Sequence, residues 1–203
     1  MKVITILAGG FSASRVDLKK LPGFVIAVND SAIYAPRIDA IVSMDRLWAE
    51  NRFAQVSKFG KPIYLRSSTV RNIPAEDVSL CVTLFDNDHK ATALSDVPGR
   101  LDGTHSGFCA LNLAFQMCPE RLYLVGFDMA LGPKGQRHWF PDYPWSNGGG
   151  SSGGKLAEWA GQFRTAAAQL ANAGIQTRLV TETISLARPF KTITPADLAR
   201  LGA

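Results

Sequence analysis

The chain has 203 residues, of which 46% are hydrophobic and 19% charged, and its formal net charge is +5. This composition is that of a globular protein with a sizeable core and excludes a disordered chain. No apolar segment reaches the ~20 residues that a membrane-spanning helix needs. Lys and Arg are scattered without a basic run, which agrees with a solvated surface and also with an anionic partner.

The first apolar segment and the cysteines together indicate a cytoplasmic protein. The segment at 3–8 is too short for a signal peptide and runs directly into glycine, so we interpret it as a strand. Three widely spaced cysteines match neither a disulfide framework nor a zinc site. We expect buried free thiols at Cys81, Cys109 and Cys118.

Along the first half of the chain, apolar strands alternate with polar turns and one helical pattern at about Arg46 to Lys58. The expected strands are Val3–Ala8, Phe24–Val28, Ala40–Ser43, Pro62–Leu65 and Val78–Leu84. Strands that are apolar throughout are buried on both faces, which favours a parallel sheet covered by helices.

The second half repeats this arrangement. A helix is expected from Thr104-His105-Ser106 to Pro119, and another from about Lys155 to Ala173 with Gly174 as its cap. The strands that follow these helices are Arg121–Val125 and Ile175–Val180. Because no linker divides the chain, we predict a single domain over 1–203, an α/β Rossmann-like three-layer sandwich with a mostly parallel sheet.

A long loop at about 129–154 interrupts this alternation of strands and helices. It is rich in glycine and in aromatic residues and shows no periodicity. Loops of this length inside a compact domain are often lids over a site. A disordered insertion is the alternative, but disordered segments contain few aromatic residues.

Glycine and small polar residues follow several strands. Ligands of open α/β sheets bind beyond the carboxyl ends of the strands, where glycine lets backbone N–H groups approach an anion and Asn or Asp can bind ribose or a base. Each residue alone would fit an ordinary turn or cap, but their recurrence favours a nucleotide- or phosphate-binding site. The residues are Gly9, Gly10, Ser12, Asn29, Asp30, Ser31, Ser43, Asp45, Gly126 and Asp128.

Two further segments suit the same ligand. Thr104, Ser106 and Gly107 open a helix, whose free N–H groups and positive dipole end favour a phosphate; an ordinary N-cap is the alternative. In the long loop, His138 beside Arg137 suits a general base or a phosphate contact, although a surface histidine would look the same.

Other known motifs for nucleotide binding or hydrolysis are absent or incomplete. The first turn is not G-x-G-x-x-G, the sequence at 149–155 has Leu156 where a P-loop needs Ser or Thr, and there is no G-x-S-x-G. Asp86 and Asp88 form a D-x-D pattern that could hold Mg²⁺ or Mn²⁺, but a solvated turn also accounts for it.

Several motifs together resemble the sialyltransferase-like and MptE-like family. They are the segments at 7–12, 25–29, 39–45 and 122–128, Ser106-Gly107 with its helix, and the segment at 187–191. That family includes bacterial CMP-sialic-acid transferases, archaeal hydroxymethylpterin diphosphokinases and small phage-encoded proteins. The length of this chain is most similar to that of the phage-encoded members.

The resemblance implies a transferase that uses a nucleotide-activated donor. It implies that Gly9, Gly10, Ser12, Asn29 and Ser106 contact the nucleotide and that a histidine in the long loop acts as base, for which His138 is the matching residue. We therefore expect an inverting, glycosyltransferase-like enzyme with a nucleotide or nucleotide-sugar donor, in which Asp128 orients an acceptor or a loop.

Three other hypotheses stay open at the level of sequence. The first is Mg²⁺-dependent phosphoryl or diphosphoryl transfer, for which the strand-end aspartates would supply metal ligands. The second is a phage transferase that modifies DNA bases, which a positive charge would help to bind. The third is a nucleotide-binding protein without catalysis.

Overall fold

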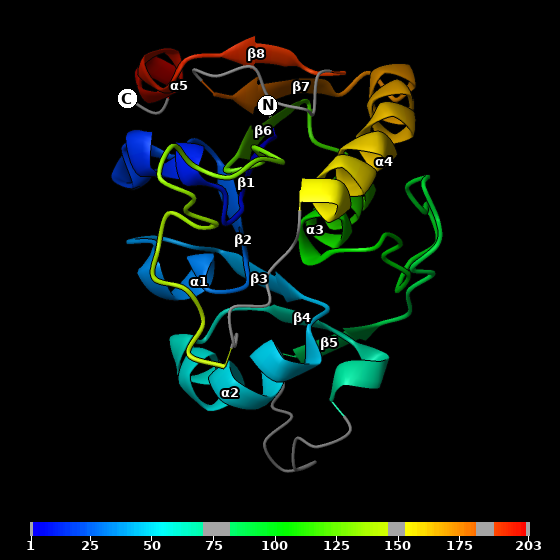
Figure 1. Ribbon diagram of the computed structural model, residues 1–203. Helices are drawn as coiled ribbons and strands as arrows, with labels where there is room; N and C mark the ends of the chain where they lie inside the picture. The colour runs from blue at the N-terminus through cyan, green and yellow to red at the C-terminus, as the bar shows by residue number, and fades with distance from the viewer. Residues whose placement is uncertain (1, 71–81, 146–152, 182–188, 202–203) are drawn as a thin grey trace.

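A computed structural model describes residues 2–70, 82–145, 153–181 and 189–201. Its centre is one eight-stranded sheet in the order β5-β4-β3-β2-β1-β6-β7-β8, in which the paired strands are all parallel (Figure 1). The strands are β1 Val3–Leu7, β2 Phe24–Val28, β3 Ala40–Ser43, β4 Ile63–Arg66, β5 Val82–Phe85, β6 Arg121–Val125, β7 Gln176–Val180 and β8 Lys191–Ile193. The chain builds outward from β1 in one direction and then from β6 in the other, so the strand order reverses between β1 and β6, where such sheets bind ligands.

Helices cover both faces of this sheet. The two long helices α3 and α4 lie on one face, and α1, α2 and α5 lie on the other (Figure 1). Their bounds are α1 Ser31–Tyr34, α2 Arg46–Val56, α3 Ser106–Gln116, α4 Gly153–Asn172 and α5 Pro195–Leu201, and the 3-10 turns are η1 Phe11–Arg15, η2 Leu18–Lys20, η3 Ser57–Phe59 and η4 Ser67–Thr69. Among the helices described here, none is long and apolar enough to cross a membrane.

The core explains why the central strands are largely apolar. In β1, Ile4 and Ile6 pack with Phe108 of α3, whereas Leu7 packs on the opposite face with Leu198 of α5. Side chains alternate between the faces of a strand, so a strand covered on both sides is apolar on both faces except where a polar side chain has a partner, as Thr5 does in donating its hydroxyl to the Pro22 carbonyl at 2.7 Å. The three-layer, Rossmann-like sandwich predicted from the sequence is confirmed.

The predicted elements and the observed ones differ mainly at short segments. β8, α1 and α5 were not predicted, because three, four and seven residues are too short to show a period. Of the predicted strand 78–84, the last part forms β5 and residues 78–81 lie outside the described residues. Gly174, with φ +74°, ends α4 as predicted.

The cysteines fit the expectation only in part. Cys109 is buried in α3, and burial raises the pKa of its thiol to about 12. The expectation was wrong for Cys118, which is exposed because it lies in the turn after α3 with φ +48° rather than on the apolar face of that helix. Cys81 lies outside the part of the chain that the structure describes.

Candidate functional site

A cleft of about 700 Å³ opens at the carboxyl ends of β1, β2, β3 and β6, the strands around the reversal of strand order. Its walls also include the start of α3, the start of α4 and part of the long loop. Most of the predicted site residues line it: Gly9, Gly10, Asn29, Asp45, Thr104, Ser106, Gly107, Asp128, Arg137 and His138. Gly126 lines it as well, whereas the remaining predicted residues Ser12, Asp30, Ser31 and Ser43 are buried and do not line it.

The floor of the cleft is formed where the turn after β1 meets the turn after β6. The Gly10 N–H donates to the Gly126 carbonyl at 2.8 Å, and a Cβ on Gly10 would lie 2.5 Å from that carbonyl oxygen. Gly126 has φ +74°, and a Cβ there would meet the Ala8 carbonyl at 2.5 Å. Only glycine allows the two backbones to approach this closely, so these glycines shape the floor.

Asp128 fixes the first turn from below. Its Oδ2 accepts a hydrogen bond of 2.7 Å from the Ser12 N–H at the start of η1, and the residue is only 8% exposed. Burial raises the pKa of this carboxyl, while its hydrogen bonds with Ser12 and the charge of Arg15 oppose the rise. Ser12 and Asp128 therefore hold the turn after β1 in place through this hydrogen bond, and the segment that the Asp128 carboxylate orients is that turn.

Asp30 is buried beneath the cleft, where it binds other side chains of the protein and does not line the cleft surface. The residue is 1% exposed, and its carboxylate accepts hydrogen bonds from Trp48 Nε1 at 2.7 Å and from Arg52 Nε and Nη2 at 3.0 and 2.7 Å. Its neighbour Asn29 does line the cleft and adopts a left-handed backbone with φ +51°. Of these two predicted residues, Asn29 therefore lies at the surface of the cleft, whereas Asp30 is buried and binds side chains of α2.

The start of α3 presents backbone groups to the cleft. The Thr104 hydroxyl donates to Gln162 Oε1 at 3.0 Å, and the Ser106 hydroxyl accepts from the Met44 N–H at 3.0 Å, which leaves the hydroxyl proton of Ser106 for a ligand. The N–H groups of Ser106 and Gly107 precede the first intrahelical hydrogen bonds. They lie where a phosphate would meet the positive end of the helix dipole.

His105, which the sequence interpretation left aside, caps this helix. Its Nδ1 accepts from the Phe108 N–H at 3.3 Å, so the proton of the neutral ring is assigned to Nε2. The ring centroid lies 4.7 Å from that of Trp159 in α4, and burial lowers the pKa of His105 to about 3. Its place directly before Ser106-Gly107 is the signal that could have indicated a capping role.

His138 lies against the turn after β1, and its neighbours in the long loop keep it there. Next to it, the Trp139 N–H donates to the Gly9 carbonyl at 3.0 Å, and the Trp139 indole donates to the Ala8 carbonyl at 3.1 Å. The His138 ring stacks on Phe140 with centroids 4.9 Å apart and planes 10° apart. The predicted loop histidine and the predicted glycine turn therefore meet in the structure.

The surroundings of His138 keep its ring neutral. Burial lowers the pKa of His138, and the nearby charge of Arg137 lowers it further. Asp142, the Gly9 backbone and the more distant Asp30 oppose this change, but the net direction is downward. A neutral imidazole at the rim of the cleft has a lone pair that can accept a proton.

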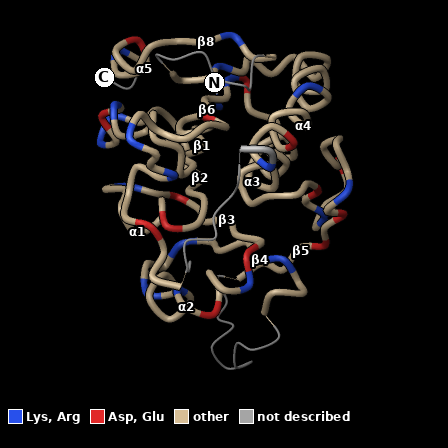
Figure 2. The backbone as a smooth tube through the Cα atoms, viewed as in Figure 1, with Lys and Arg blue, Asp and Glu red and all other residues tan. Residues whose placement is uncertain are grey.

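Charged side chains of both signs surround the cleft. Arg137 and Lys155 line it, and Lys155 Nζ lies 5.7 Å from the ring centre of Trp159. Asp45 caps α2 by accepting from the Trp48 N–H at 3.0 Å. Elsewhere Lys and Arg are spread over many elements and form no single basic face in this view (Figure 2).

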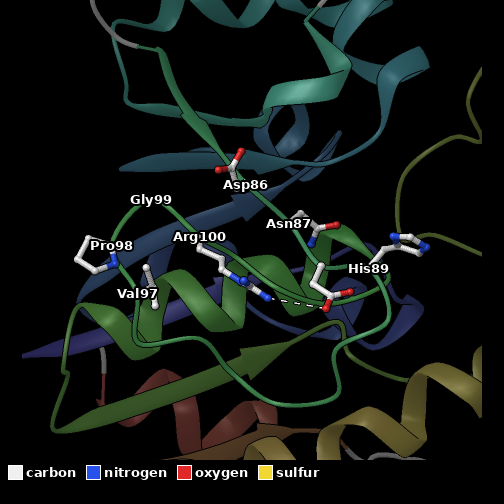
Figure 3. Close-up of a pocket in the computed structure, with 8 residues that line it drawn as sticks. Asp86, Asn87, His89, Val97, Pro98, Gly99 and Arg100 are labelled. Atoms are coloured by element: carbon white, nitrogen blue, oxygen red, sulfur yellow. Dashed lines mark ion pairs between the residues drawn. The ribbon is translucent and has the colours of Figure 1, made fainter.

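Asp86 and Asp88 lie at a separate, more open pocket of about 540 Å³ beyond β5. Asp88 pairs with Arg100 at 3.7 Å, and the Asp86 carboxylate points away from the Arg100 guanidinium (Figure 3). Asp86 instead accepts from the Ser67 hydroxyl at 3.3 Å. Within the described ranges, no group of three or more His, Cys, Asp and Glu could hold a metal ion.

Comparison with known proteins identifies a fold. No family model matches the chain, and no curated protein matches it. Among solved structures, it is similar to the sialyltransferase CstII from Campylobacter jejuni, whose structure was analysed in complex with a substrate analogue, CMP-3FNeuAc. The TM-score is 0.53 at 14% identity, over 95% of this chain and 86% of that one, so the likeness establishes a shared α/β fold.

Proposed function

We propose that this protein is an inverting transferase that uses a nucleotide-activated sugar as donor, with His138 as its general base. The observation that carries the proposal is the position of a neutral His138 against the Gly9 turn, across the cleft from the N–H groups that open α3. The fold shared with a sialyltransferase supports the same proposal of a transferase.

The reaction would proceed in one displacement. His138 takes the proton of an acceptor hydroxyl as the hydroxyl oxygen forms a bond to the anomeric carbon of the donor. The bond between that carbon and the donor phosphate oxygen breaks, and the phosphate leaves with the electron pair. Attack on the face opposite the leaving group inverts the anomeric centre.

The leaving phosphate needs stabilisation at the other side of the cleft. The donors at the start of α3 are the N–H groups of Ser106 and Gly107 and the Ser106 hydroxyl, and Arg137, beside His138 in the long loop, adds a guanidinium to the lining of the cleft. Preorganised donors of this kind stabilise developing negative charge without having to reorient. The glycines of the floor leave the backbone open to the nucleotide.

Phosphoryl transfer through metal-binding carboxylates is less well supported. Asp30 is bound by Arg52 and Trp48, Asp128 accepts from Ser12, and Asp45 caps α2. Each strand-end carboxylate has a partner of its own, so these groups do not form one cluster of ligands. For a base-modifying activity on DNA, the Lys and Arg residues in the described part of the chain are spread over many elements (Figure 2).

A ligand screen followed by one substitution tests the proposal. Thermal shifts with CMP, CDP, UDP, GDP, ATP and their sugar conjugates, with and without Mg²⁺, identify the donor, because a ligand at 100 times its Kd stabilises by about 2.7 kcal/mol. Release of free nucleotide in the presence of candidate acceptors then measures turnover.

His138→Ala should abolish turnover while the thermal shift by the donor persists. His89→Ala is the matched control, because His89 is exposed at the separate pocket. Undiminished turnover in His138→Ala would contradict the role of the base. A nucleotide that binds tightly to the wild type without any turnover would instead indicate a binding protein.

A further inference from the structure

Below the cleft, Arg52 of α2 is fixed by a buried carboxylate. Its Nε and Nη2 donate to the two oxygens of Asp30 at 3.0 and 2.7 Å, and the Arg52 side chain is 20% exposed. Trp48 Nε1 donates to the same carboxylate at 2.7 Å. A guanidinium held by two parallel hydrogen bonds has its plane set by the carboxylate, unlike a lysine ammonium.

The face of this guanidinium is covered by the long loop. Arg52 Cζ lies 5.0 Å from the ring centre of Trp145, and Trp145 stacks on Tyr143 with centroids 5.2 Å apart and planes 23° apart. The Tyr143 hydroxyl makes hydrogen bonds with the Asn29 side chain and the Asp30 backbone. Two aromatic residues of the loop are therefore placed by the end of β2 and by α2.

Tyr143 in turn meets His138. Their ring centroids are 5.2 Å apart with planes at 64°, so an edge of one ring meets the face of the other. The other side of His138 stacks on Phe140. A continuous series of contacts thus runs from the Asp30 carboxylate through Arg52, Trp145 and Tyr143 to the His138 ring.

We propose that Arg52 is a positioning residue that acts through Trp145 and Tyr143 to set where the His138 ring stands over the Gly9 turn. Its importance for catalysis rests on the proposed function, but its effect on His138 is a structural property that holds with or without turnover. The attachments of the loop then include Trp139 on the β1 turn, Tyr143 on Asn29 and Asp30, and Trp145 on Arg52.

Arginine is required at this position for geometric reasons. Arg52→Lys keeps the positive charge beside Asp30 but loses both the fork that fixes the guanidinium and the flat face that covers Trp145. Trp145→Leu removes the stack from the other side without disturbing the buried ion pair, whereas Trp145→Phe retains an aromatic face. The last two substitutions act where loss of folding is not expected.

The titration of His138 reports whether the ring has moved. The charged groups near it are Asp142, Arg137 and Asp30, and the rings of Phe140 and Tyr143 exclude water. All three charges persist in the substitutions above, so a change in the midpoint reports altered burial of the ring or a change in its hydrogen bond with the Gly9 backbone, of which burial has the larger effect. Release of Tyr143 admits water and should raise the pKa of His138 towards its ordinary value of about 6.5.

The experiment follows the imidazole signals of the three histidines by NMR titration of the full chain, with assignments from single histidine substitutions. In Arg52→Lys and Trp145→Leu the His138 midpoint should rise above its wild-type value, while that of exposed His89 stays constant. Trp145→Phe should titrate like the wild type. Trp159→Leu is the matched control, because Trp159 contacts His105 and has no ring contact with His138.

Kinetics separate this proposal from the proposed function. With an active donor, Arg52→Lys and Trp145→Leu should lower kcat about tenfold with little change in the KM for the donor, and Trp145→Phe should restore most of it. If the wild type turns over no donor, the proposed function fails while the titration still decides the positioning role. An unchanged His138 midpoint in both Arg52→Lys and Trp145→Leu would overturn that role.

Discussion

The Ser12 N–H donates to Asp128 Oδ2 at 2.7 Å, and this buried hydrogen bond joins residues 116 positions apart beside the floor of the cleft. It ties the turn after β1 to the loop after β6, directly at the reversal of strand order. Asp128 is buried enough for its pKa to be raised, so the carboxylate is held there by specific donors rather than by water. The position of the glycine floor therefore depends on this contact.

Replacing the Asp128 carboxylate tests this dependence. Asp128→Ala leaves the buried Ser12 N–H without its acceptor, which should lower the free energy of unfolding by about 1–3 kcal/mol. Asp128→Asn keeps a carbonyl acceptor and should lose less. Urea unfolding at pH 7 measures both, and equal stability of the Ala variant and the wild type would contradict a role for the contact.

The glycine floor can be tested by adding a single methyl group. In Gly10→Ala the new Cβ would lie 2.5 Å from the Gly126 carbonyl oxygen and 2.7 Å from Asp128 Oδ2, so the backbone must shift. We expect a loss of about 2 kcal/mol or more in the free energy of unfolding, together with weaker binding of the proposed nucleotide donor.

Gly161→Ala is the matched control for that substitution. Gly161 lies in α4, and a Cβ there meets nothing within 4 Å. Alanine is the better helix former, so this variant should gain about 0.5–1 kcal/mol. Gly10→Ala should therefore lower the free energy of unfolding and Gly161→Ala should raise it in the same assay. If Gly161→Ala were also destabilised, the loss in Gly10→Ala could not be attributed to the close contacts of its new Cβ.

The sequence predicted the sheet better than the roles of its polar residues. Apolar strands such as Val3–Leu7 and Phe24–Val28 were found because burial on both faces leaves a continuous local pattern. Gly9 and His138 were placed in one site because strand ends and long loops are where ligands bind. These inferences need only local sequence and the general geometry of parallel sheets.

Side-chain partners could not be predicted in the same way. Nothing near Asp30 in the sequence indicates that Arg52 and Trp48 occupy its carboxylate, because these contacts depend on how α2 packs beneath β2. The same holds for Trp145, whose ring contacts Arg52 of α2 as well as Tyr143 of its own loop. Three-dimensional packing decides whether an aspartate at a strand end faces a ligand or the protein.

The pH dependence of turnover should report the His138 base. Burial lowers the pKa of His138 below about 6.5, and a general base is active in its unprotonated form. The rate at low donor concentration should therefore fall along an acidic limb whose midpoint lies below pH 6.5, and the fall should approach tenfold per unit at still lower pH. An acidic limb centred above 6.5 would contradict the burial of this ring.

His105 predicts a loss of stability in acid. Its pKa is lowered to about 3 in the folded protein, against about 6.5 in the unfolded chain. Between these values the unfolded state binds a proton that the folded state does not, so acidification favours unfolding. The free energy of unfolding should fall by up to about 1.4 kcal/mol for each pH unit below 6.5 from this residue alone.

His105→Asn isolates this contribution. Asparagine keeps a side-chain acceptor for the Phe108 N–H and so preserves the cap, but it does not titrate. The variant loses the packing of the ring on Trp159 at every pH, so the informative quantity is the change in stability between pH 7.5 and 5.0. The wild type should lose about 2 kcal/mol more than the variant over this interval. The lowered pKa of His138 acts in the same direction in both proteins and cancels, so parallel stability curves would show that the His105 ring is solvated in the folded state.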